Sequence, residues 1–249
     1  MEKTLIKGLD LLEALALSDE PRGVTDLAGE LGMTKSNVHR LLQTLVFRGY
    51  ARQVAGAERY GCTLRLWELG ALIAERIELP KVAQTFMQEL ANATHETIHL
   101  SILEGADALY VAKIDSSQPV RAYSRVGGRA PAHCVATGKA LLAHVPDGQL
   151  DHLFPSFEKF TPRTIMSLDA LRTELGKIRD QGYAINRGEW RETVCGVASA
   201  IFDASKKAVA AIGISGPIER LTPGVLRDHA PRVQNTARGI SRALGYKGA

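Results

Sequence analysis

Two side chains in this sequence have the chemistry of a thiol nucleophile and its base, and they are neighbours. Cys134 directly follows His133, and a second thiol, Cys195, lies much later in the chain. Adjacent residues generally point apart, so His133 is poorly placed to activate Cys134. No carboxylate has a spacing that completes a triad, and no His, Cys and Asp cluster has metal-ligand spacing. We therefore favour Cys134 and Cys195 as small, partly buried groups that line or support a cavity. A thiol-dependent enzyme that uses Cys134 is the alternative.

Anion binding is a second kind of chemistry that the C-terminal half could perform. Residues 127–139 (GGRAPAHCVATGK) form a shaped loop that leads into a helix. We expect Thr137 to cap this helix and Gly138 to open it, which would leave free N–H groups that attract carboxylates and phosphates. The stretch is not a phosphate-binding P-loop, because Ala140 stands where that motif needs Ser or Thr.

A second polar stretch, residues 186–196 (NRGEWRETVCG), precedes an apolar strand. Asn186 and Glu189 in this stretch can bond the polar atoms of a ligand, although both can also be solvated loop residues. An anion-accepting pocket built from the two stretches is the interpretation that we favour.

DNA contact is the third kind of chemistry, and it is concentrated in the N-terminal part. One helix face offers hydroxyl, amide and guanidinium groups, which suits phosphates and base edges in a major groove. No acidic residue occurs from Thr34 to Gly49. An ordinary helical hairpin with a solvated polar face is the alternative. The candidate residues on or beside this helix are Thr34, Lys35, Ser36, Asn37, His39, Arg40 and Gln43.

The charge distribution favours the DNA interpretation. Residues 1–32 carry three basic and seven acidic side chains, a net charge of −4, whereas residues 33–65 carry six basic and one acidic, a net charge of +5. A local basic region of this kind favours contact with a polyanion.

Residues 24–50 predict two short helices joined by a tight turn. We expect Thr25 to cap the first helix and Gly32 to end it, and Thr34 to cap the second and Gly49 to end it. The second helix has a stripe of apolar residues at helical spacing. These residues are Val38, Leu41, Leu42 and Leu45.

The flanking segments complete a winged helix-turn-helix. A helix over residues 4–17 is expected to pack through Leu5, Leu9, Leu12 and Ala16. Two short strands around a turn at 55–57 would form a hairpin, the wing, that carries Arg52 and Arg59. That fold has a helix, a helix-turn-helix and a basic hairpin in this order. The wing would contact the DNA backbone or the minor groove.

The rest of the chain predicts a linking helix and a larger domain. The helix over 64–78 is too apolar for a solvated linker, so we expect it to pack on its own domains or on the same helix of a second subunit. Strands are expected at 94–103, 106–114, 119–123, 183–187, 195–203 and 208–215, and helices at 80–94, 137–145, 147–153, 168–181 and 222–244. This pattern gives an α+β domain with a mainly antiparallel sheet. The expected domains are 1–63, 64–78 (linker or dimerisation helix) and 79–249.

Length and composition exclude several classes of protein. A chain of 249 residues with 45% hydrophobic residues folds into one large or two smaller domains. No membrane-spanning run and no signal-peptide core occur, so we expect a cytoplasmic protein with no membrane partner. Three widely spaced cysteines argue against a disulfide framework and against C-x-x-C motifs. No cofactor and no metal are expected.

Three motifs resemble those of the IclR-type transcriptional regulators over nearly the whole chain. They are LAGELGMTKSNVHRLLQTL at 27–45, R-x-P-x-H-C-x-A-T-G-K-A-L-L-A at 129–143, and the IFD…ISGP segment at 201–217. The resemblance implies an N-terminal winged helix-turn-helix, a linking helix and a GAF-like effector domain. It also implies dimers or tetramers that bind palindromic operators and respond to small metabolites, often organic or aromatic acids.

The resemblance implies in addition where the effector pocket lies. Ala136 and Thr137 would line it at the helix start, with Asn186 and the Cys195–Gly196 pair facing them. Asn186 replaces an acidic residue found in some members, and Thr193 stands where glycine is frequent. The full set of candidate effector residues is Cys134, Ala136, Thr137, Gly138, Asn186, Glu189, Cys195 and Gly196.

We therefore predict a ligand-responsive regulator that binds double-stranded operator DNA as a homo-oligomer, a dimer or a tetramer. A small effector, expected to be a carboxylate, would bias the placement of two DNA-binding domains through the helix at 64–78. A non-specific nucleic-acid binder is the remaining alternative.

Overall fold

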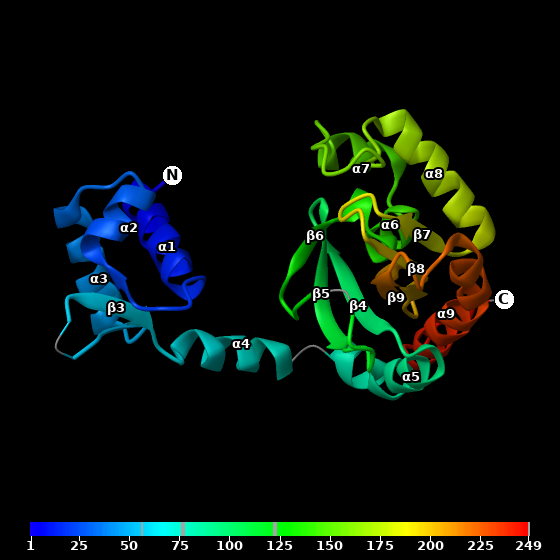
Figure 1. Ribbon diagram of the computed structural model, residues 1–249, viewed down its shortest axis with the longest axis horizontal. Coiled ribbons are helices and arrows are strands. Elements are labelled where there is room, and N and C mark those ends of the chain that lie inside the picture. The colour runs from blue at the N-terminus through cyan, green and yellow to red at the C-terminus, as the bar shows by residue number, and fades with distance from the viewer. Residues whose placement is uncertain (56, 76–77, 122–123, 249) are drawn as a thin grey trace. The chain divides into compact units, whose positions relative to one another are not determined.

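The computed structural model describes residues 1–55, 57–75, 78–121 and 124–248 (Figure 1). Its contacts divide the chain into two compact units, Met1–Ile77 and Glu78–Ala249. Three expectations fall partly outside the described residues. They concern Gly56 of the wing turn, residues 76–77 of the linking helix, and residues 122–123 of a strand. Within the described part of the chain, no helix is long and apolar enough to cross a membrane.

The N-terminal unit is a three-helix core with a small sheet, a winged helix-turn-helix as predicted. The strand order is β1-β3-β2, and the short β1, which pairs with β3, was not expected. The elements are α1 (Lys3–Ala16), β1 (Arg22–Gly23), α2 (Val24–Glu30), α3 (Lys35–Phe47), β2 (Ala51–Gln53), β3 (Arg59–Cys62) and α4 (Arg65–Glu75).

Helix ends in this unit follow the sequence signals, with one exception. The Thr34 side chain accepts a hydrogen bond from the Asn37 backbone N–H at 3.3 Å and so caps α3. Gly32 and Gly49 have φ values of 61° and 75°, the left-handed conformation expected after a helix. Thr25 does not cap α2, because that helix begins one residue earlier and has Gly23 at its N-cap without a side-chain bond.

The predicted core stripe of α1 is wrong. Leu5 and Leu9 are 62% and 50% exposed, and the buried residues of this helix are Leu11, Ala14 and Leu15. Leucines occur on more than one side of α1, so two apolar stripes compete. The core is completed by the stripe that meets α2 and α3.

The C-terminal unit is an α+β domain around a six-stranded antiparallel sheet, as predicted. The strand order is β6-β5-β4-β9-β8-β7. The strands are β4 (Thr97–Glu104), β5 (Asp107–Ile114), β6 (Arg129–Pro131), β7 (Ala184–Arg187), β8 (Val194–Phe202) and β9 (Ala208–Pro217).

Helices cover both faces of this sheet (Figure 1). On one face lie α5 (Glu78–Thr94) and α9 (Pro223–Ala243); on the other lie a 3₁₀ turn (Ala132–Cys134), α6 (Ala136–Leu142), α7 (Asp147–Leu153) and α8 (Leu168–Gln181). Alternation along β8 sends Val197 into one core and Ala198 into the other. The central strands are therefore buried on both faces.

Two local expectations in this unit are wrong. The described part of 119–123 is not a strand, and the third strand is β6 at 129–131 instead. Thr137 is not the cap of α6: Val135 occupies the N-cap position without a side-chain bond, and Thr137 lies inside the first turn. Its hydroxyl bonds Ser101 on β4 at 3.2 Å, which places it toward the sheet.

Candidate functional site

The candidate DNA-contact residues on or beside α3 present polar side chains. Of the candidate residues on or beside this helix, Asn37 is half-buried and the other six are exposed. Arg40 donates a long hydrogen bond to the Asn37 side chain at 3.4 Å, which holds the two side chains together on this surface. Guanidinium and amide groups so placed can bond base edges or phosphates.

The wing carries its two arginines on the face away from the core. The register places Gln53 opposite Tyr60, which is buried, so Arg52 and Arg59 lie on the other face of the hairpin. A shallow groove separates α3 from the wing. It is bordered by Lys35, Ser36, His39 and Gln43 of α3 and by Gln53, Glu58 and Tyr60.

A cavity lies in the C-terminal unit where the sheet meets the start of α6 and the 188–193 loop. Its volume is about 50 Å³. The wall includes backbone or small side chains at several positions, among them Gly196 and Gly213. The lining residues are His99, Tyr110, Ser124, Val135, Ala136, Thr137, Asn186, Trp190, Arg191, Val194, Gly196, Gly213, Ile214 and Ser215.

The sheet side of the cavity is polar but neutral. His99 lies between two serines, with Nε2 2.6 Å from the Ser124 hydroxyl and Nδ1 3.2 Å from that of Ser215. Burial, and to a lesser degree the charge of Lys113, lowers the pKa of His99 to about 3. Burial raises the pKa of Tyr110 to about 12. Both groups are uncharged at neutral pH.

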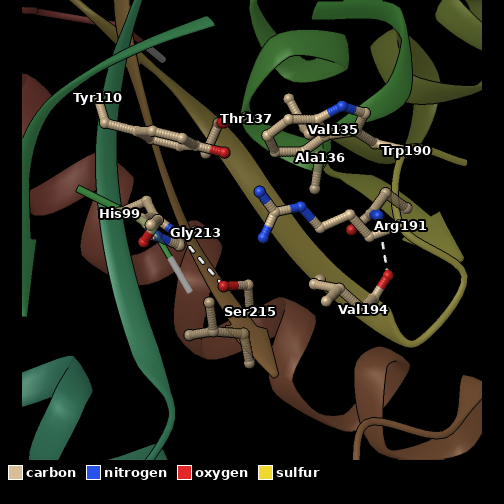
Figure 2. A pocket seen from close by; sticks show the side chains of 14 residues that line it. His99, Tyr110, Val135, Ala136, Thr137, Trp190, Arg191, Val194, Gly213 and Ser215 are labelled. Atoms are coloured by element: carbon tan, nitrogen blue, oxygen red, sulfur yellow. Dashed lines mark hydrogen bonds between the residues drawn. The ribbon is translucent and has the colours of Figure 1, made fainter. Parts of the chain in front are cut away.

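The positive charge at the cavity comes from Arg191. Figure 2 shows its guanidinium among Tyr110, Thr137 and Trp190, pointing into the space that His99 and Ser215 border. The guanidinium carbon lies 4.5 Å from the centre of the Trp190 ring, a cation–π contact that orients it. Among the described lining residues there is no carboxylate, so the cavity suits an anion.

The structure brings half of the predicted effector residues to this cavity. Ala136, Thr137, Asn186 and Gly196 border it, and Asn186 lies directly opposite Gly196 in the β7–β8 register. A Cβ at 196 would lie 2.6 Å from the Ile214 carbonyl oxygen and 3.1 Å from Asn186 Oδ1, so glycine is favoured there.

The other four predicted residues lie outside the lining set and have structural surroundings. Cys195 points from β8 into the core under α5 and α9. Gly138 packs α6 against the 3₁₀ turn, since a Cβ there would lie 2.3 Å from the Ala132 carbonyl oxygen. Glu189 forms a buried ion pair with Lys139 at 3.0 Å. Cys134 is fully buried.

The environment of Cys134 does not produce a nucleophile. Burial raises the pKa of its thiol to about 12, and the charge of Glu189 adds to the effect. The thiolate, which is the reactive form, is therefore negligible at neutral pH. His133 lies instead among Phe154, Phe157 and Phe160.

The sequence reasoning missed the residues that contribute most of the cavity's polarity: His99, Tyr110, Ser124, Trp190, Arg191 and Ser215. A signal existed for two of them. His99 is a polar residue inside a strand whose neighbours are apolar, and Arg191 lies within the polar stretch that was singled out. Tyr110, Ser124 and Ser215 come from separate segments whose meeting only the fold defines.

The two units together define a class of protein, a winged helix-turn-helix DNA-binding regulator with a sensory α+β domain. Comparison with known proteins gives the same class. The model of the IclR helix-turn-helix domain matches residues 4–55, and that of the bacterial transcriptional regulator IclR C-terminal domain matches residues 71–242.

Individual relatives match over almost the whole chain. The HTH-type transcriptional regulator KdgR of Escherichia coli (strain K12) is 36% identical over 245 residues, with 98% of this chain and 93% of the relative covered. A crystal structure of a regulator from Rhodococcus sp. RHA1 aligns with a TM-score of 0.83 at 30% identity, covering 98% and 99% of the two chains. The Thermotoga maritima IclR structure aligns with a TM-score of 0.79 at 28% identity, covering 99% and 100%.

The chain belongs to the IclR family of bacterial transcriptional regulators. It is a DNA-binding transcriptional regulator with an effector-binding C-terminal domain, and it is not an enzyme.

Proposed function

We propose that this regulator binds a palindromic operator as a homo-oligomer, and that a small carboxylate changes its affinity for the operator. The observation that carries the effector assignment is the Arg191 guanidinium, which points into a cavity whose other polar groups are neutral. A carboxylate in the cavity could accept charge-assisted hydrogen bonds from this guanidinium, which are stronger than bonds between neutral groups.

The hydroxyl groups around Arg191 supply the remaining contacts. Thr137 Oγ1 can accept the hydrogen of Ser101 and turn its own hydrogen into the cavity. Ser124 and Ser215 both bond to His99. The neutral ring donates its one N–H to one serine and accepts the hydrogen of the other, so only the first serine can donate its own hydrogen to a ligand while keeping its bond to His99. Such a site accepts a carboxylate with a neighbouring hydroxyl or carbonyl group.

The cavity volume limits the size of the effector. About 50 Å³ is well below the roughly 150 Å³ of a cavity that accommodates benzene. A short aliphatic acid therefore fits the observed conformation. An aromatic acid enters only if the loop that carries Trp190 and Arg191 moves.

Operator contact is assigned to α3 and the wing. Ser36, Asn37, His39, Arg40 and Gln43 would lie at or near the bases, with Gln43 also bonding Tyr60 of the wing at 3.5 Å. Thr34, Lys35, Arg52 and Arg59 would contact phosphates, which makes affinity salt-dependent. A dimer reading two half-sites one helical turn apart, or a multiple of it, requires a palindromic operator.

Exposed leucines and a tryptophan in the N-terminal unit support the homo-oligomer. Leu5, Leu9, Leu64, Trp67 and Leu72 are each at least half exposed, on α1, on α4 and just before it. An apolar groove lined by α1, α3 and α4 adjoins them. Exposed apolar side chains beside an apolar groove are typical of an interface, and a second copy of the same unit would cover them.

A thermal-shift panel tests the effector class, because a ligand that binds only the folded state raises its melting temperature. Acetate, propionate, pyruvate and benzoate are each compared with a neutral amide counterpart (acetamide, propionamide, pyruvamide and benzamide). We expect an acid to raise the melting temperature and its amide not to, and Arg191→Met to remove the difference. Equal shifts by acid and amide in the wild-type protein would contradict a carboxylate effector.

A further inference from the structure

An ion cluster at a fully buried lysine anchors the loop over residues 188–193, which carries Trp190 and Arg191, and the lysine does not line the cavity. The Lys139 side chain is 1% exposed. Its Nζ lies 3.0 Å from Glu189 Oε1 and 3.3 Å from Glu174 Oε1. A lysine is rarely buried to this degree unless it is paired, so the two carboxylates explain how it is tolerated.

The two carboxylates come from different parts of the domain. Glu189 is in the loop, one residue before Trp190, and its side chain is 11% exposed. Glu174 is on α8 and is 31% exposed. Lys139 itself is on α6, two residues after Thr137, which borders the cavity. The lysine therefore connects the helix that forms one wall of the cavity to the loop that forms another.

Further hydrogen bonds fix the backbone of the loop at the same point. The second oxygen of Glu189, Oε2, accepts the Arg187 backbone N–H at 3.1 Å. Thr164 donates to the Glu189 carbonyl oxygen at 2.7 Å, and Thr161 donates to that of Gly188 at 2.8 Å. Both the side chain and the backbone of Glu189 are thus immobilised, while the next two residues face the cavity.

We propose that Lys139 is a positioning residue for the effector site: through Glu189 it holds the 188–193 loop so that Trp190 and Arg191 face the cavity. Lys139 does not border the cavity itself. Its effect on the effector is exerted through the place of the Arg191 guanidinium, and the pair Lys139–Glu189 sets how far this loop can open for a larger acid. The functional consequence rests on the proposed effector site, whereas the clamp is testable without a ligand.

The cluster offers a matched pair of substitutions. Because Lys139 has two carboxylate partners, removing either one leaves the lysine charge paired with the other. Glu189→Ala removes the side-chain attachment of the loop to Lys139, and Glu174→Ala removes a carboxylate that is not part of the loop. A cluster that merely supports the core would respond similarly to both.

Trp190 is the reporter. The chain has two tryptophans, so a Trp67→Phe background leaves Trp190 as the source of indole fluorescence. In that background and without ligand, we expect Glu189→Ala to raise the acrylamide quenching constant of Trp190 about two- to threefold, because the clamped loop opens locally. Glu174→Ala is expected to leave it unchanged. Equal quenching in the two variants would overturn the proposal.

Two further arms separate the possible failures. If Glu189→Ala does not fold, as judged by circular dichroism, Glu189→Gln takes its place, because it keeps the shape of the side chain and removes the charge. A Trp190 quenching constant in Glu189→Gln equal to that in Glu174→Ala then overturns the proposal. An acetate titration followed by Trp190 emission tests the consequence: we expect at least about tenfold weaker binding in the Glu189 variant only. If acetate leaves the wild-type protein unaffected, the proposed carboxylate effector fails, while the quenching result still decides the clamp.

Discussion

The α3 surface and the cavity of the C-terminal unit differ in how they are built. The α3 surface consists of solvent-exposed side chains on one helix and one neighbouring hairpin. The cavity is assembled from five strands, one helix start and two loops, and its residues are interlocked with buried partners. A substitution on α3 should therefore change binding without changing the fold, whereas a substitution around the cavity should change both. Each of the following predictions tests that difference.

Gly138→Ala is expected to have the largest effect. An added Cβ would lie 2.3 Å from the carbonyl oxygen and 2.4 Å from the Cα of Ala132, both backbone atoms that cannot turn away. We expect a loss of about 3 kcal/mol or more in the free energy of unfolding of the C-terminal unit, measured by chemical denaturation.

Gly148→Ala is the matched control for this change. Gly148 is also a helical glycine, in α7, but nothing lies within 4 Å of its added Cβ. Its substitution should be neutral or stabilising by up to about 1 kcal/mol. Equal destabilisation by the two changes would show that Gly138 is not needed for close packing.

Arg40→Ala is expected to weaken operator binding about ten- to a hundredfold and to leave the unfolding curve unchanged, since the guanidinium is exposed and contacts only Asn37 among the bonds described. Arg48→Ala removes the same charge from the exposed C-terminal end of α3 and should cost much less. Fluorescence anisotropy with labelled operator at physiological salt measures both. Unchanged affinity in Arg40→Ala would remove this residue from the DNA-contact surface.

His133→Phe tests whether a buried histidine in the C-terminal unit makes the stability of this unit depend on pH. Burial, with a smaller contribution from the charge of Lys139, lowers the pKa of His133 to about 4, and among the described residues neither ring nitrogen has a hydrogen-bond partner. Between pH 6.5 and 4 the unfolded chain therefore binds a proton that the folded chain does not. The free energy of unfolding must fall as the pH falls through this window.

Replacing His133 with Phe should remove this loss, because Phe suits the surrounding cluster of three phenylalanines. We expect the difference in stability between pH 7 and pH 4.5 to shrink by about 2 kcal/mol relative to the wild-type protein. An equally steep fall in the variant would mean that other groups account for the acid sensitivity.

Thr34→Ala is expected to have the smallest effect. Loss of the bond to the Asn37 N–H should destabilise α3 by about 1 kcal/mol and weaken operator binding a few-fold. Thr25→Ala is its control, because Thr25 lies inside α2 and makes no cap. Similar losses in both variants would contradict the assignment of Thr34 as the cap.

The same contrast explains what the sequence could predict. The ends of α3 and α8, the wing and the antiparallel sheet follow from local signals such as Thr34, Gly49 and Gly182 and from alternation in the strands. The buried stripe of α1 does not follow from such signals, because its leucines allow either of two faces to be buried. Thr25 was misassigned because a polar residue near the start of a helix is not always its N-cap.

Half of the candidate effector residues line the cavity, and the reason lies in alternation and in loop geometry. Asn186 and Gly196 border the cavity, but Cys195, the neighbour of Gly196, faces the opposite core. Glu189 is turned away toward Lys139, and the cavity receives Arg191 instead. Which residue of a loop points inward depends on its anchors, and the anchor, Lys139, lies in another helix.

The central claim is that the cavity is the input and α3 the output of one regulator. It is tested most directly by measuring operator affinity with and without the acid that stabilises the wild-type protein most, in wild type and in Arg191→Met. We predict equal affinities without the acid, a clear shift on its addition to wild type, and no shift in the variant. A shift of the same size in Arg191→Met would contradict the assignment of this cavity as the effector site.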